Sequence, residues 1–238
     1  MIHLNKHCKI KLSHIGEQKT PVIIIDELLA DCHPLREFAQ TRAQFEAEKN
    51  SYYPGRRAQL PQAYLDTLNT FFIQLIKQVY KIDGTVSGLI KPSVFSLLTR
   101  DESALLPEQC IPHYDSKLPR YFAMTHYLNF GEFSGTAFYR NRQSGIEVVN
   151  QNNVKDYINA INGHVQTHGM FEQKYFSDSS DMFELMGVVP WQENRAVVYP
   201  GGLLHSPYID NVALNVRNSI KQGRLTANLF IDLTDQPN

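Results

Sequence analysis

Three residues of the chain have the types and spacing of a metal site. His113 and Asp115 stand two apart in the segment IPHYDS, and positions i and i+2 of an extended segment project to the same face. An imidazole and a carboxylate can therefore converge on one ion. His205, in RAVVYPGGLLHSPY, follows a β-branched run and a Pro-Gly-Gly corner and is the candidate third ligand. Two histidines and one carboxylate form the facial triad that suits non-haem Fe(II), because it leaves coordination positions open.

An HxD tripeptide alone is a weak signal, because the chain contains nine histidines. The alternative is that His113 and Asp115 cap a turn and that His205 forms a hydrogen bond near the Pro-Gly corner. The order of the surrounding elements favours the metal site.

Short β-rich runs bounded by Gly, Pro, Asn and Asp fill the chain from about residue 86. These runs are SVFSLLTR, IPHYDS, RYFAMTHYLNF, GTAFYR, RAVVYPG and RLTANLFIDL. Upstream, PVIII at 21–25 predicts a strand, and LREFAQTRAQFEAEK predicts a helix. Apolar residues at helical spacing in 61–80 predict an amphipathic helix that backs a sheet. The polar stretch 140–182 predicts an insertion between two strands, with one short helix at YINAI.

A length of 238 residues suits one large β-rich domain over 1–238, with 1–85 as an N-terminal strand and helical support and 86–238 as the β core. Lys and Arg number 23 against 24 Asp and Glu, so no positive field favours nucleic acid or an anionic membrane. A small-molecule or peptide/protein substrate fits better, and a homodimer is left open. The three cysteines form no CxxC pair and the N-terminus has no apolar run, which predicts a reducing, cytoplasmic location.

Taken in order, the β-rich runs resemble the core strands of the Fe(II)/2-oxoglutarate-dependent dioxygenase superfamily, especially its prolyl-hydroxylase-like branch. The resemblance covers about residues 93–233: an HxD strand, a YLN strand, a strand of the GGxxFY kind, a strand leading to the distal histidine, and an arginine strand. PVIIIDELLADCHPLREFA and YYPGRR are similar to the N-terminal portion of a bacterial subgroup of that branch. The resemblance implies an α+β, mainly β fold with a double-stranded β-helix core (jelly roll, cupin-like) and N-terminal helices packed on one side.

The resemblance also implies Fe(II), 2-oxoglutarate and dioxygen as cofactors. The family binds the far carboxylate of 2-oxoglutarate with a cation, and Arg224 is the candidate because an alternating apolar run follows it. Thr226, two residues on, matches the hydroxyl residue of the family's RxS pattern. Arg217 is the alternative anchor, since the spacing from the distal histidine to Arg224 is longer than the family norm. Tyr127 is expected to contact the cosubstrate, although it could equally be a packed strand aromatic.

A second group of residues predicts the substrate mouth. Tyr53, Arg56 and Arg57 concentrate an aromatic ring and two cations at one turn, and Trp191 could form a pocket wall. The alternatives are an exposed turn before a helix and, for Trp191, a core position. We expect substrate to enter between this turn and the 140–182 insertion, because long insertions gather at the open end of a barrel.

The resemblance implies a hydroxylase of undetermined substrate. Related halogenases lack the carboxylate ligand, so the presence of Asp115 favours hydroxylation or a similar oxidation. Two alternatives stay open: a non-catalytic metal-binding, sensor or scaffold protein of the same fold, and a cupin-like metalloenzyme that does not use 2-oxoglutarate.

Overall fold

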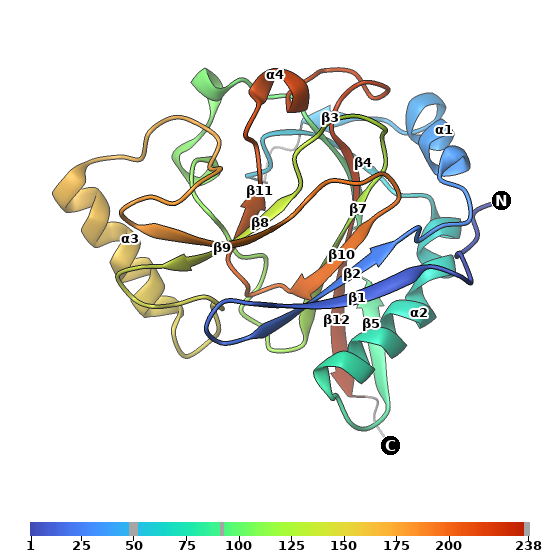
Figure 1. The fold of residues 1–238 in the computed structure, drawn as a ribbon, viewed down its shortest axis with the longest axis horizontal. Coiled ribbons are helices and arrows are strands. Elements are labelled where there is room, and N and C mark those ends of the chain that lie inside the picture. The colour runs from blue at the N-terminus through green and yellow to red at the C-terminus, as the bar shows by residue number, and fades with distance from the viewer. Residues whose placement is uncertain (48–51, 91–92, 236–238) are drawn as a thin grey trace.

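The computed structural model describes residues 1–47, 52–90 and 93–235, and it is built around two antiparallel sheets (Figure 1). Within these ranges the larger sheet has nine strands in the order β1-β2-β10-β7-β12-β6-β4-β3, with β5 also paired to β12. The smaller sheet, over the same ranges, has the order β11-β8-β9. The larger sheet comprises β1 (Lys9–Ile15), β2 (Thr20–Asp26), β3 (Glu46–Ala47), β4 (Gly55–Gln59), β5 (Val86–Ile90), β6 (Val94–Leu98), β7 (Tyr121–Tyr127), β10 (Ala196–Pro200) and β12 (Leu225–Asp235). The smaller sheet comprises β8 (Thr136–Asn141), β9 (Phe183–Val189) and β11 (His205–Pro207).

Helices lie on both outer sides of the pair of sheets. They are α1 (His33–Thr41), α2 (Gln62–Tyr80), α3 (Val154–His168) and α4 (Val212–Asn215), with short 3-10 turns at Glu102–Ala104 and Pro107–Gln109. In Figure 1, α2 lies beside β5 and β12 of the larger sheet, whereas α3 lies beyond the smaller sheet. A mainly β, α+β architecture is therefore present, as the sequence predicts.

The largest apolar core lies between α1, α2 and the larger sheet. Helix α2 places Tyr64, Leu68, Phe72 and Ile76 four residues apart, and all four side chains are fully buried. Burial of each such apolar side chain stabilises the fold by about 1.5–3 kcal/mol. The amphipathic helix predicted at 61–80 is confirmed.

Successive side chains of β7 point to opposite faces of the larger sheet, toward this core on one face and toward the space between the sheets on the other. Phe122 and Met124 pack toward the helices, whereas Ala123 and Tyr127 pack against the smaller sheet. A third core fills the outer face of the smaller sheet beneath α3. Strand β7 thus carries residues that pack toward the helices and residues that pack toward the smaller sheet.

Two local expectations differ from the structure. The helix expected over LREFAQTRAQFEAEK ends at Thr41, and Phe45 is buried in the core as the chain turns into β3; residues 48–49 of that expectation lie outside the described ranges. IPHYDS is not a continuous strand, because its pairing is limited to one bridge between His113 and His205. Pro112 has no amide N–H to extend a ladder at that point.

The 140–182 insertion does connect two strands, β8 and β9. Its helix, α3, is longer than the YINAI core suggests. No helix in the described part of the chain is long and apolar enough to cross a membrane.

Candidate metal centre

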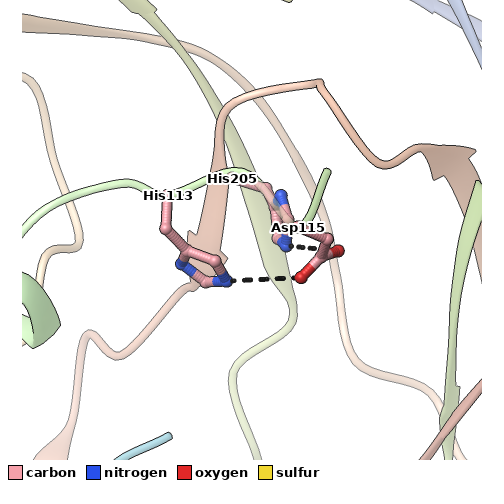
Figure 2. Close-up of side chains that lie close together, drawn as sticks. All are labelled: His113, Asp115 and His205. Carbon is pink, nitrogen blue, oxygen red and sulfur yellow. Dashed lines mark ion pairs between the residues drawn. The ribbon is translucent and has the colours of Figure 1, made fainter. Parts of the chain in front are cut away.

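The side chains of His113, Asp115 and His205 point toward one another (Figure 2). The Nε2 atom of His113 lies 4.0 Å from one carboxylate oxygen of Asp115, and Nε2 of His205 lies 3.5 Å from the other. One candidate ligand atom from each residue falls within 4.8 Å of the other two. Neighbouring ligands roughly 2.0–2.2 Å from a common first-row metal lie about 3 Å apart, so the three groups need only a small closing movement to bind one ion.

Backbone hydrogen bonds hold the three ligands in place. His113 and His205 exchange two bonds of 2.9 Å, each N–H donating to the other residue's carbonyl. The N–H of Asp115 donates to the carbonyl of Gly201 at 2.7 Å. A side chain at Gly201 would collide with the ring of Tyr121, because a Cβ there would lie 2.5 Å from its Cδ1. The Pro-Gly-Gly corner therefore positions Asp115 as well as His205.

The hydrogen bond of the His205 ring defines which nitrogen is available. Its Nδ1 lies 2.8 Å from the carbonyl oxygen of Leu203, and a carbonyl only accepts, so Nδ1 carries the proton. The lone pair of Nε2 then faces Asp115. This backbone-oriented imidazole is the arrangement usual for metal-bound histidine.

Burial disfavours the charged forms of two of the candidate ligands. Burial raises the pKa of Asp115, while the charges of His205 and Arg57 partly oppose this rise. Burial, followed by the charges of His205 and Arg57, holds the pKa of His113 well below its ordinary value, although 48% of the side chain faces open space. Neutral imidazole is the form that binds metals.

One buried oxygen atom of Asp115 bears on whether the three candidate ligands fit a metal ion. Among the described residues, Oδ2 of Asp115 is buried without a hydrogen-bond partner. A buried, unsatisfied carboxylate oxygen is costly unless a cation or donor compensates it. Two imidazole nitrogens and one carboxylate fit a divalent first-row transition metal such as Fe(II).

An inner cavity adjoins the triad between the two sheets. Its lining includes all three candidate ligands together with Arg57 and Arg224. The Arg224 side chain is buried, and its Nε and Nη2 donate to the carbonyls of Ser134 (2.9 Å) and Gly135 (2.8 Å). The sequence-predicted anchor is thus in the cavity.

Two further cosubstrate candidates have different positions. Thr226 also lines the inner cavity, but its Oγ1 lies 3.5 Å from the Ser96 carbonyl oxygen, a long hydrogen bond. Arg217 is exposed, and its Nε donates to the carbonyl of Ala213 at 2.9 Å. Of the two arginines weighed from sequence, Arg224 is the one placed beside the candidate ligands.

The structure places Tyr127 and Trp191 behind Arg224, and neither lines the inner or the outer cavity. Their rings stack at 4.5 Å, and the Arg224 guanidinium lies 5.9 Å from the Tyr127 ring and 5.3 Å from the Trp191 ring. The Tyr127 hydroxyl is engaged with the Thr136 hydroxyl at 2.8 Å. Both rings thus occupy the packed positions given above as alternatives to a cosubstrate contact for Tyr127 and a pocket wall for Trp191.

An outer cavity of about 540 Å³ continues from the inner one. Tyr53 and Arg57 line both cavities, and Tyr175 and Phe176 of the 140–182 insertion line the outer one. The YYPGRR segment and the insertion therefore meet beside His113, as expected for a mouth.

The Arg56 side chain does not lie at the expected substrate mouth. Neighbouring residues of a strand point to opposite faces, and in β4 this places Arg57 on the cavity side. The Arg56 guanidinium instead donates to the carbonyl of Phe45 and to Oδ1 of Asn218. Arg56 therefore lines neither cavity, and of the two arginines only Arg57 lies where the sequence places the substrate mouth.

Sequence reasoning missed several residues of the site. Asn228 and Phe230 line the inner cavity because they follow Thr226 at every second position of β12, and this parity was a usable signal. Tyr199 also lines it, with its ring 4.7 Å from that of His205. No local pattern distinguishes Tyr199 from an ordinary strand aromatic.

Fold and site together define a mainly β protein with a His-Asp-His cluster beside a cavity between two sheets. The chain belongs to a family of unknown function, DUF6445, whose family model matches residues 6–231. A search of curated proteins finds no match.

Proposed function

We propose that the protein is a non-haem Fe(II)- and 2-oxoglutarate-dependent oxygenase that hydroxylates its substrate. The observation that carries the proposal is the placement of Arg224 in the same cavity as His113, Asp115 and His205. A metal triad alone fits many reactions, but a buried arginine beside it fits a second ligand that bears a carboxylate.

The finer fold is part of the same proposal. We take the two sheets, with their shared core and the cavity between them, as the halves of a double-stranded β-helix. In this arrangement His205 comes from β11 and Arg224 immediately precedes β12. Both lie where the order of strands in the resembling dioxygenases would place the distal histidine and the arginine.

Each residue has a defined task in this proposal. His113, Asp115 and His205 would hold the iron, which together with 2-oxoglutarate and dioxygen supplies oxidative decarboxylation coupled to oxidation of a C–H bond. Arg224 would pair with the far carboxylate of 2-oxoglutarate through its planar fork. The carbonyls of Ser134 and Gly135 already fix one side of that guanidinium, so little side-chain freedom would be lost on binding.

The surroundings of Arg224 strengthen its pairing with a carboxylate. Burial lowers the pKa of Arg224, an effect that shows how little solvent surrounds its charge. A charge-assisted pair is stronger where water is excluded than at an exposed surface. Tyr53 and Arg57 line both the inner and the outer cavity, and they would orient the primary substrate.

An anaerobic titration tests the proposal directly. The Fe(II)-loaded protein is titrated with 2-oxoglutarate while the visible metal-to-ligand charge-transfer band is recorded. We expect a saturable band in the wild type, and its loss in His113→Ala and His205→Ala because each removes one ligand. His164→Ala, at a histidine of α3 outside both cavities, is the matched control and should keep the band.

Two outcomes separate the alternatives. Iron binding without a 2-oxoglutarate band would contradict the proposal and favour a cupin-like metalloenzyme that does not use this cosubstrate. A band without substrate-dependent release of succinate, across a broad substrate panel, would favour a non-catalytic sensor or scaffold.

A further inference from the structure

Aromatic side chains dominate the outer cavity. Aromatic residues make up 11% of the chain, but they provide seven of the sixteen residues that line this cavity. The rings are those of Tyr52, Tyr53, Tyr114, Tyr121, Tyr175, Phe176 and Phe230. Such an enrichment is well beyond what the composition of the chain alone would give, so the cavity wall has a definite chemical character.

These rings come from segments far apart in the sequence, and contacts outside the cavity hold several of them. The Tyr121 and Phe230 rings, from β7 and β12, stack on each other at 6.1 Å. The Tyr175 hydroxyl donates to the carbonyl of Arg100 at 2.6 Å. Phe176 meets Tyr139 edge to face at 5.0 Å. The aromatic wall is therefore preorganised, and little of its order would have to be gained on binding.

The aromatic wall lies against the candidate metal ligands. His113 and Asp115 line the outer cavity together with the rings, and the His113 side chain is 48% exposed. A molecule in this cavity would therefore touch the accessible edge of the metal site. A volume of about 540 Å³ is in the range of pockets that bind small organic ligands.

We infer that the primary substrate presents an aromatic ring, which the outer cavity binds through stacked and edge-to-face contacts beside the metal. This inference rests on the proposed oxygenase function and names the substrate class of that same site. The charged groups of the wall besides the candidate ligands are one cation, Arg57, and one anion, the exposed Glu108. The ring, rather than a net charge, is therefore the feature that the cavity selects. Each aromatic contact favours such a ring by about 2- to 10-fold.

A matched pair of neutral probes tests the inference. The dissociation constants of 3-phenylpropanamide and 3-cyclohexylpropanamide are measured by ligand-observed NMR, with metal-free protein and with Fe(II) and 2-oxoglutarate under anaerobic conditions. The two probes share chain length and amide group, but only the phenyl ring can stack. We expect the phenyl probe to bind at least 5-fold more tightly than the cyclohexyl probe.

Variants locate the preference in the wall. Phe230→Leu and Tyr121→Leu keep apolar volume but remove a ring, and each should reduce the preference to below 2-fold. Phe130→Leu makes the same change at an exposed phenylalanine outside the cavity and should leave the preference intact. Tyr52→Leu, at a side chain that is 63% exposed, supplies a third wall variant that does not disturb packing.

The outcomes for the two proposals are distinguishable. Three results would overturn the inference, even where the 2-oxoglutarate band is present. They are equal affinity for the two probes, tighter binding of the non-aromatic ligand D-glucose than of the phenyl probe, and an unchanged preference in every wall variant. A ring preference that the wall variants abolish, in a protein without that band, would refute the oxygenase and retain the aromatic-binding cavity.

Discussion

At Asp115 a carboxylate is buried beside two imidazoles, and a charge in such a place needs compensation. The HxD spacing predicted the pair and the strand order predicted His205, because ligand identity and parity are local properties of sequence. The separation of Arg56 from Arg57 was not predicted. It depends on β4 being a strand of the larger sheet, whereas the Pro-Gly composition of YYPGRR indicated a turn.

The first prediction at this scale concerns the cosubstrate anchor. Arg224→Ala should weaken 2-oxoglutarate binding to the iron-loaded protein by about 2–5 kcal/mol, because the far carboxylate would be left buried without its cation. Calorimetric titration under anaerobic conditions measures the change. Arg217→Ala is the control and should have no effect, since Arg217 is exposed and outside the cavity.

Arg57 requires a parallel measurement, because it is the other arginine that lines the inner cavity. Arg57→Ala should leave 2-oxoglutarate affinity nearly unchanged if its place is on the substrate side. Loss of affinity in Arg57→Ala together with normal affinity in Arg224→Ala would transfer the anchor to Arg57.

At the scale of the elements, alternation of polar and apolar residues predicted strands reliably where one face of the strand is buried. It gave no strand prediction where neither face is buried. In β7, for example, His126 and Tyr127 are neighbours and so face opposite sides, and His126 lies in the core against α2. Strand β1 was not predicted, although Ile10 and Leu12 alternate with lysines in it; both side chains are exposed. Helix α1 was extended too far because its continuation has helix-forming composition, and composition does not show that Phe45 is needed in the core.

His126 links three elements, and its titration should appear in stability. The ring joins β7 to the Tyr64 hydroxyl of α2 at 2.8 Å and to Oδ1 of Asn194 at 3.1 Å. Burial lowers the pKa of His126 from 6.5 to about 4. Between these values the unfolded chain binds a proton that the folded chain does not, so the free energy of unfolding falls as the pH is lowered from about 6.5 toward 4.

In His126→Gln this contribution, on the order of 3 kcal/mol, should be absent from the pH dependence. Urea denaturation at pH 7 and pH 4.5 gives the comparison with wild type. His14→Gln, at an exposed histidine of β1, should titrate like wild type. An equal pH slope in wild type and His126→Gln would mean that His126 is protonated in the folded state.

Glu147 attaches the β1–β2 hairpin to the segment before α3. Its carboxylate is buried and accepts the N–H groups of Glu17 (2.9 Å) and Gln18 (3.2 Å). Glu147→Gln turns an amide N–H₂ toward one of these donors, and it should destabilise the protein by about 1.5–3 kcal/mol in urea denaturation. Glu184→Gln, at a side chain that is 44% exposed, should reduce the free energy of unfolding much less. Equal reductions in the two variants would mean that the hydrogen bonds from Glu17 and Gln18 to Glu147 do not stabilise the fold.

For the whole molecule, the sequence predicted a β-rich core with helical support but not which strands would be neighbours. Strand β2 pairs with β10, about 170 residues later, so this N-terminal strand is part of the larger sheet. Such pairing depends on long-range packing, which local patterns do not contain. The metal site has the same long-range character, since its ligands come from two segments about 90 residues apart.

This separation leads to the last prediction. An ion held by His113, Asp115 and His205 would bind the folded chain and not the unfolded one, and so would stabilise the fold by about 2.7 kcal/mol at a hundredfold excess over Kd. For a chain of this size that corresponds to a rise in Tm of about 5–10 °C. Thermal denaturation with anaerobic Fe(II), and with Mn(II) as an air-stable substitute, measures the rise. Asp115→Ala should abolish it, because two imidazoles alone bind these ions weakly. His164→Ala tests the pair of histidines on α3, His164 and His168, whose rings stack at 4.7 Å. A rise that persists in Asp115→Ala and disappears in His164→Ala would place the ion on α3, and the triad would then not be the metal site.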